Sequence, residues 1–113
     1  MKRKSTVLLL LSVLLNSLGA QAIEKSGPGT VDRLVSYSSV GNGDVFISLS
    51  TNGATCNYGY FVNKNSQGFE GQLSMLLAAY QAKTPIYISA NENSRWSNSS
   101  NTVCEVHSIE YKH

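Results

Sequence analysis

The stretch "DVFISLSTNGATCNYGYFV", residues 44–62, decides the expected fold because it joins two strand patterns across a turn. In its first half Val45, Ile47 and Leu49 alternate with other residues, so they share one face of a strand. The dipeptide Asn52–Gly53 suits the positive φ angles of a tight turn. The stretch therefore predicts two consecutive strands of a meander.

The segments on either side extend this pattern. The run "TCNYGYFV", residues 55–62, is rich in aromatic residues and predicts the later strand, with Gly59 marking a bulge or a close approach. Upstream, "VDRLVSY" at 31–37 predicts an earlier strand, and "GNG" at 41–43 is a turn signal. Three consecutive strands are expected before the spacing of the apolar residues changes from that of a strand to that of a helix.

The period changes after residue 68, where apolar residues follow a helical spacing. One predicted helix face carries Phe69, Leu73, Leu76, Leu77 and Tyr80. Thr84–Pro85 ends this helix, because proline cannot continue it. Two further strands are expected, "PIYISA" at 85–90 and "TVCEVHSIEY" at 102–111. The predicted order is β-β-β-α-β-β.

This order predicts a mainly β domain with one helix, an OB-fold-like barrel of five strands. Cys56 begins the third predicted strand and Cys104 begins the fifth; they are the only two cysteines. In such a barrel the third and fifth strands lie side by side and run parallel, so we expect a Cys56–Cys104 disulfide. This disulfide would close a loop of nearly fifty residues. In the chain-entropy model, closing such a loop stabilises the folded state by about 4 kcal/mol.

The N-terminus has the pattern of a signal peptide. A basic start, Met1–Lys4, precedes the apolar run 6–19, and Ala20–Ala22 supplies small residues for cleavage after Ala22. We therefore expect residues 1–22 to be a signal peptide and the protein to be periplasmic or extracellular. Residues 23–29 are expected to form a flexible arm, and 30–113 a single OB-like domain.

Charge and composition exclude several partners and cofactors. Three of the nine basic residues lie in the leader, which leaves six against seven acidic residues. No basic stripe remains to neutralise phosphates, so nucleic acid is not expected as a partner. No second apolar run of membrane-spanning length follows the leader, so no span is expected in the mature chain.

Catalytic and metal-binding motifs are missing from the sequence. The two histidines, His107 and the terminal His113, are too few for an imidazole zinc site, and sulfurs in a disulfide cannot supply thiolates. No nucleophile motif or phosphate loop is present, and no acid–base pair can be named. We expect no catalytic residue, no metal and no cofactor.

The candidate binding residues surround the only tryptophan, in the polar run "NENSRWSNSSN" at 91–101. Either Trp96 caps an open end of the barrel, or it faces outward beside Arg95 and Asn98 to bind a ligand. Sugars need that combination, because an aromatic ring stacks on their C–H faces while polar groups bond to hydroxyls. Tyr58 and Tyr60, expected on one face of the third strand, complete the candidate ligand-binding set.

The segment from 44 to 96, with its Cys-containing strand, its helix "FEGQLSMLLAAYQA" and its strand "TPIYIS", resembles the B subunits of pertussis-like and subtilase-type bacterial AB toxins. The resemblance implies a secreted, disulfide-bonded OB-fold that assembles as a homopentamer and binds host glycans. It does not extend to the longer termini and further cysteines of those subunits. Ser48 and Ser50 lie in the region of their sugar-binding serine, but neither aligns with it.

Two functions are therefore expected. The first is a secreted, non-catalytic module that binds a glycan or surface receptor and is able to form a ring. The alternative is a periplasmic structural or inhibitor-like protein that binds one protein partner. Met75, Ala78, Ala79 and Ala82, on the helix face expected opposite the apolar stripe, favour close approach of a partner or simply reflect helix propensity.

Overall fold

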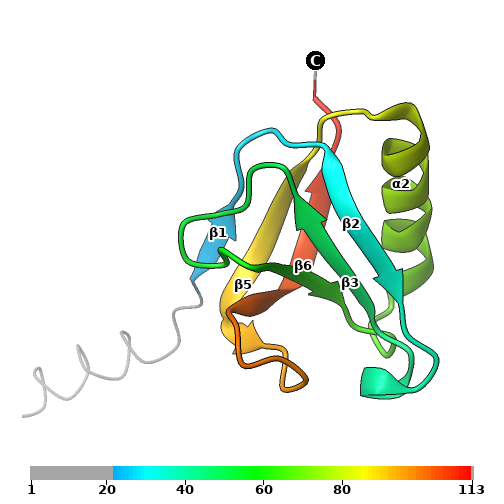
Figure 1. The fold of residues 1–113 in the computed structure, drawn as a ribbon, viewed down its shortest axis with the longest axis vertical. Coiled ribbons are helices and arrows are strands. Elements are labelled where there is room, and N and C mark those ends of the chain that lie inside the picture. The colour runs from blue at the N-terminus through cyan, green and yellow to red at the C-terminus, as the bar shows by residue number, and fades with distance from the viewer. Residues whose placement is uncertain (1–21, 113) are drawn as a thin grey trace, which may run out of the picture.

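The structure is a computed structural model that describes residues 22–112. Figure 1 shows the long helix packed beside a twisted sheet. The elements are β1 (Ile23–Lys25), β2 (Val31–Ser36), η1 (Val40–Asn42), β3 (Val45–Leu49), β4 (Gly59–Val62), α2 (Phe69–Ala82), β5 (Tyr87–Arg95) and β6 (Val103–Glu110). Apart from Ala22, the predicted signal peptide lies outside the described residues. Within residues 22–112, no helix has the length and apolar character needed to cross a membrane.

The sheet has six strands in the order β1-β5-β6-β4-β3-β2 and is open. The meander β2–β3–β4 is antiparallel, as the hairpin pattern predicts. β4 and β6 run parallel, with Tyr60 beside Cys104, which confirms the predicted pairing of those two segments. The mainly β class with one helix is confirmed, but the sheet contains one strand more than the five predicted.

The additional strand β1 comes from the predicted N-terminal arm. Ile23–Lys25 pairs antiparallel with Ser89–Asn91 of β5, and Gly29 forms a bridge to Ile86. The same segment then enters β2, which pairs with β3. A single stretch of chain thus hydrogen-bonds to β5 with its first half and to β3 with its second half (Figure 1). The pattern of the sequence did not reveal this pairing, because three residues are too few to show a period.

Glu24 of β1 holds the loop that precedes β4. Its carboxylate accepts hydrogen bonds from the backbone N–H groups of Thr55 at 2.8 Å and Cys56 at 3.0 Å. Partial burial raises the pKa of Glu24, but the hydrogen bonds donated by Cys56 and Thr55 lower it by more, so the net pKa lies below its ordinary value of 4.5. Glu24 therefore fastens β1 to the disulfide loop when it is ionised.

The stabilisation from Glu24 depends on pH in a defined direction. A group whose pKa is lower in the folded state than in the unfolded state stabilises the fold at pH values above its unfolded-state pKa. That stabilisation is lost as the pH falls through its folded-state pKa. We expect the free energy of unfolding to decline from about pH 5 downward, and to decline less steeply in Glu24→Gln. Urea titrations at several pH values measure this. Asp32→Asn, a change of an exposed carboxyl on β2, is the control for the removal of one carboxyl. Equal slopes for the wild type and Glu24→Gln would contradict the role of Glu24.

The main core lies between one face of the sheet and α2. Val45, Ile47 and Leu49 all belong to it, which confirms their predicted shared face. The buried members are Val31, Val45, Ile47, Leu49, Cys56, Tyr60, Val62, Phe69, Leu76, Ala79, Ile86, Ile88, Ala90, Cys104 and Val106. The strands on this side carry β-branched residues, which suit a packed pleated surface.

The helix begins and ends as the sequence predicts, but its buried face is rotated from the predicted one. Phe69, Leu76 and Ala79 are buried, whereas Leu77 is 48 % exposed and Tyr80 is 45 % exposed. The predicted apolar stripe was wider than the face that one sheet can cover, so its outer edge stays in solvent. Ala79, expected on the opposite face, is in contact with the core instead.

The Cys56–Cys104 disulfide is formed and fully buried, with the two Cα atoms 5.7 Å apart. Cys56 lies three residues before β4 rather than at its first residue, so the bridge joins the preceding loop to β6. The bridge spans a sequence separation of 48 residues. A long loop of this kind loses much conformational entropy in the unfolded chain when it is closed.

Removing the disulfide tests this contribution. We expect the double variant Cys56→Ser/Cys104→Ser to lose about 4 kcal/mol of unfolding free energy, because its unfolded chain regains the entropy of an open loop. Urea denaturation followed by the fluorescence of Trp96 measures the loss. A difference below about 1 kcal/mol would contradict a dominant role for the bridge in so small a domain.

Candidate functional site

A second apolar cluster lies on the opposite face of the sheet from the main core. We call it the outer cluster; its buried members are Phe46, Phe61, Trp96 and Val103. Phe46 alternates along β3 with the residues of the main core, so β3 is buried on both faces. Such burial on the second face of a small sheet needs a cover, and the side chain of Trp96 supplies it.

The backbone around Trp96 is more regular than the polar sequence predicts. β5 continues as far as Arg95, and the register with β6 shifts between Asn91 and Arg95, where a bulge lies. Trp96 then donates its backbone N–H to the carbonyl of Val103 at 2.9 Å. Bulges change the direction of the following side chain. Here the bulge precedes Trp96, which turns onto the sheet and is only 7 % exposed.

Aromatic stacking and one buried hydrogen bond fix the position of the indole. The ring lies nearly parallel to Phe61 and Phe46, with centroids 5.8 Å and 6.2 Å away. Its Nε1–H donates to Asp44 Oδ2 at 2.9 Å, and Asp44 Oδ1 accepts the backbone N–H of Lys64 at 2.8 Å. Trp96 is therefore neither a plug at the end of a barrel nor an exposed ring, but the packed cover of the outer cluster.

Asp44 is 4 % exposed and links three loops that meet at this end of the sheet. It precedes β3, accepts from the β4–α2 loop through Lys64, and accepts from Trp96 at the end of β5. Gly41, with φ +59°, passes directly over it: a Cβ there would lie 1.9 Å from Asp44 Oδ2. Only glycine fits this approach, which explains the Gly-Asn-Gly sequence just before Asp44.

Replacement of Asp44 tests this junction. Asp44→Ala removes the acceptor of two N–H donors, the buried indole of Trp96 and the partly buried backbone of Lys64, so we expect a loss of about 2–4 kcal/mol in unfolding free energy. Asp44→Asn keeps one acceptor oxygen and is expected to lose less. Because the chain contains one tryptophan, a red shift of its emission in Asp44→Ala reports directly on its release. A stability change under about 0.5 kcal/mol, the scale of an ordinary surface substitution, would contradict the assigned role.

Two adjoining hollows surround Trp96, and we call them together the Trp96 groove. The first, the polar hollow, has a volume of about 320 Å³ and is lined by Trp96, Asp44 and polar side chains from the β4–α2 loop, β5, the β5–β6 loop and β6. These polar side chains include Asn63, Asn65, Ser94, Arg95, Asn98 and Glu105. Ser94 donates its hydroxyl to Glu105 at 2.7 Å, so Glu105 is held in place. The hollow offers amide donors and carboxylate acceptors above an aromatic edge.

The second, the aromatic hollow, has a volume of about 170 Å³ and shares Trp96 and Asn98 with the first. Tyr37, Phe46 and Tyr58 supply its rings, and Tyr58 is 44 % exposed. The guanidinium of Arg33 lies 5.3 Å from the centroid of Phe46, a cation–π arrangement. This hollow offers a flat apolar surface with a cation at its rim.

The structure brings together four of the five predicted ligand-binding residues. Trp96, Arg95 and Asn98 line the polar hollow, and Tyr58 lines the aromatic hollow. Tyr60 does not join them, because it is fully buried in the main core and its hydroxyl accepts the Gly53 N–H at 2.8 Å.

The separation of Tyr58 from Tyr60 has a local cause. The intervening Gly59 has φ +150°, and a Cβ there would lie 2.5 Å from the carbonyl oxygen of Ile47. β4 begins only at Gly59, so Tyr58 is outside the ladder and does not follow its alternation. The prediction that both tyrosines share one strand face was wrong for this reason, although the sequence correctly marked Gly59 as irregular.

Sequence reasoning missed Asp44, Glu105 and Arg33, which also line the groove. Nothing in their spacing distinguishes them from other surface charges, because they come from β2, the start of β3 and β6. The one available signal was the glycine-rich run before Asp44, which indicates a crowded backbone at that point.

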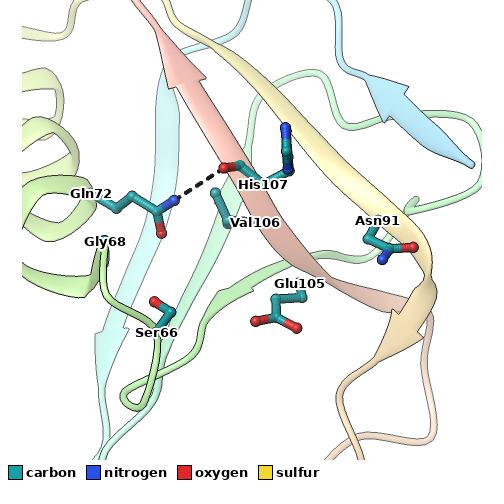
Figure 2. A pocket seen from close by; sticks show the side chains of 7 residues that line it. All are labelled: Ser66, Gly68, Gln72, Asn91, Glu105, Val106 and His107. Carbon is teal, nitrogen blue, oxygen red and sulfur yellow. Dashed lines mark hydrogen bonds between the residues drawn. The ribbon is translucent and has the colours of Figure 1, made fainter. Parts of the chain in front are cut away.

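A third hollow, the α2 hollow, adjoins the groove through Glu105. It has a volume of about 290 Å³ and is lined by Ser66, Gly68, Gln72, Asn91, Glu105, Val106 and His107. Figure 2 shows Gln72 donating to the backbone carbonyl of His107, with the imidazole directed away from Glu105. Within residues 22–112, no three His, Cys, Asp or Glu side chains gather closely enough to hold a metal ion.

Comparison of the chain with protein-family models, with curated proteins and with solved structures found no match. The geometry of the groove combines a rigid aromatic floor, a rim of amides and hydroxyls, and two carboxylates that act as hydrogen-bond acceptors. Such an arrangement can hold a polar ligand that also has an apolar face.

Proposed function

We propose that this chain is an exported, non-catalytic binding module and that the Trp96 groove binds a glycan. The observation that carries the proposal is the pairing of exposed aromatic surface with amide and hydroxyl groups on a packed floor. Tyr58 offers a ring face, and Asn98 is shared by both hollows. A sugar ring presents C–H groups on one face and hydroxyls around its edge, so it complements both features at once.

The rigidity of the floor supports the proposal. A site whose side chains are already held in place costs little ordering entropy when a ligand binds. Trp96 is stacked and hydrogen-bonded, and Glu105 is held by Ser94. The rim residues stand on loops, where binding residues of many scaffolds are found.

The arrangement of strands is also consistent with an OB-fold-like module. The β2–β3–β4 meander, the helix that follows it and the β5–β6 hairpin keep the predicted connectivity. In OB-folds the corresponding loops, after the first and before the last of the five strands, flank the ligand face. Here the loops at 37–44 and 96–102 contribute Asp44 and Asn98 to the groove.

Substitution of exposed rim residues tests the proposal without loss of the fold. We expect Tyr58→Ala and Asn98→Ala each to lower affinity for a bound glycan by about tenfold, since one stacked ring or hydrogen bond is removed. Tyr111→Ala, a change of an exposed tyrosine outside the groove, is the matched control. The measurement is a glycan array followed by calorimetry on each hit, with melting temperatures for all variants.

Trp96→Ala is a less direct test because Trp96 covers the outer cluster. We expect it to lower both the stability and the affinity. Loss of stability with unchanged glycan affinity in Trp96→Ala, together with unchanged affinity in Tyr58→Ala and Asn98→Ala, would overturn the assignment of the groove. An array with no signal above background for the wild type would overturn glycan binding itself.

A second candidate function is the binding of a protein, and the exposed apolar residues of α2 favour it. Leu77 and Tyr80 stand in solvent one turn apart, beside the exposed Ala78. The partner is either further copies of this chain, assembled as a ring, or a different protein. Light scattering behind a sizing column distinguishes these two cases. A mass near five protomers that falls to one in Leu77→Ser supports a ring, whereas a wild-type monomer leaves a different protein as the partner.

A further inference from the structure

The chain contains two Asn-Gly pairs in turns, and they differ in how many hydrogen bonds hold them. Asn42–Gly43 lies at the end of η1, and Asn52–Gly53 lies in the β3–β4 loop. Asparagine is a thermolabile side chain, and it reacts fastest before glycine, where no Cβ hinders the following backbone nitrogen. The sequence alone gives the two pairs similar reactivity.

Asn52–Gly53 is held by hydrogen bonds at every group that the reaction uses. Asn52 Oδ1 accepts the N–H of Leu49 at 2.8 Å, and Asn52 Nδ2 donates to the carbonyl of Asn57 at 3.2 Å. The Gly53 N–H donates to the buried hydroxyl of Tyr60 at 2.8 Å. These hydrogen bonds therefore hold both the side-chain amide of Asn52 and the nitrogen of Gly53, which would attack it, and they must break before the two can react.

Asn42–Gly43 is held by much less. Asn42 is exposed with φ 64°, and within the described residues its side-chain amide makes no hydrogen bond. Gly43 donates its N–H only to the carbonyl of Val40, at 3.1 Å on the surface. Gly43 itself has φ +103°, a conformation that glycine adopts without a steric cost.

We propose that Asn42 is a site of spontaneous deamidation and that Asn52 is protected. The nitrogen of Gly43 loses its proton and attacks Cγ of Asn42, so that a new C–N bond forms. The bond from Cγ to the side-chain nitrogen then breaks, and the departing NH2 group takes up a proton and leaves as ammonia. Water then opens the cyclic imide and gives aspartate or isoaspartate. Water is the only co-reactant, and no electron is transferred to or from the protein.

The modification falls on the rim of the Trp96 groove. Asn42 lines the polar hollow together with Asp44 and Glu105. The product adds a negative charge to a hollow that already has two carboxylates, and isoaspartate lengthens the backbone of the loop that passes over Asp44. If the groove binds a glycan as proposed above, the aged protein binds it more weakly.

The expected deamidation rates of Asn42 and Asn52 depend on how many hydrogen bonds must break before the reaction. Each such bond slows the reaction about fivefold. Asn52 has two side-chain bonds that Asn42 lacks, so we expect Asn42 to react about 25-fold faster in the folded protein. In the reduced, urea-unfolded chain these bonds are absent, and the two sites are expected to react at similar rates.

The experiment is incubation of the oxidised mature chain at neutral pH and 37 °C, followed by peptide mass spectrometry with fragment ions that separate the two sites. The reduced, unfolded chain and Asn42→Gln are run in parallel. In the folded wild type we expect a mass gain mainly at Asn42, and we expect none at this position in Asn42→Gln. In the reduced, unfolded chain we expect Asn42 and Asn52 to gain mass at similar rates. Equal rates in the folded protein, or faster reaction at Asn52, would overturn the proposal.

A second variant isolates the protection of Asn52. Tyr60→Phe removes the hydroxyl that accepts the Gly53 N–H, so we expect deamidation at Asn52 to rise about fivefold while the rate at Asn42 stays constant. No rise at Asn52 would refute the protective role of Tyr60. These measurements use no ligand, so they stand or fall separately from the proposed glycan binding.

Discussion

The hydrogen bond from Trp96 Nε1 to Asp44 is the interaction on which the second face of the sheet depends. Its acceptor is buried, so the bond forms where water competes little. The other oxygen of Asp44 holds the backbone of Lys64, which ties the β4–α2 loop to the same point. One carboxylate thus connects three loops, which contribute Asn42, Asn63 and Asn98 to the lining of the groove.

The domain divides its apolar residues between two faces, and each face has its own cover. α2 and the Cys56–Cys104 bridge close the main core, whereas Trp96 stacks on Phe46 and Phe61 of the outer cluster, with Tyr37 packed beside it. A domain of this size buries little surface, so a second cluster adds stability that a single core would not supply. The same packing gives the groove a rigid aromatic floor beneath side chains that remain free to contact a ligand.

The sequence predicts the parts of this fold that local periodicity governs. The alternation of Val45, Ile47 and Leu49 gave the inner face of β3, and the helix was found with its ends. The placement of the disulfide and of the parallel β4–β6 pair followed from connectivity.

What the sequence could not give depends on contacts between distant segments. β1 is too short to show a period, and the polar residues 91–95 become strand because β1 and β6 lie on either side of them. The Trp96 loop was correctly singled out, but the partner of the indole, Asp44, lies 52 residues away and carries no local signal. Tyr60 was misplaced because one glycine, Gly59, changes the path of the backbone.

The most direct test of this account is the hydrogen exchange rate of the Trp96 indole N–H, followed by NMR in deuterated water. The chain has one tryptophan, so one resonance reports on it without assignment. Burial on the outer cluster with a bond to Asp44 predicts exchange far slower than that of a free indole, requiring opening of the structure. Exchange at the rate of a free indole would show an exposed ring and would contradict the packed floor of the groove.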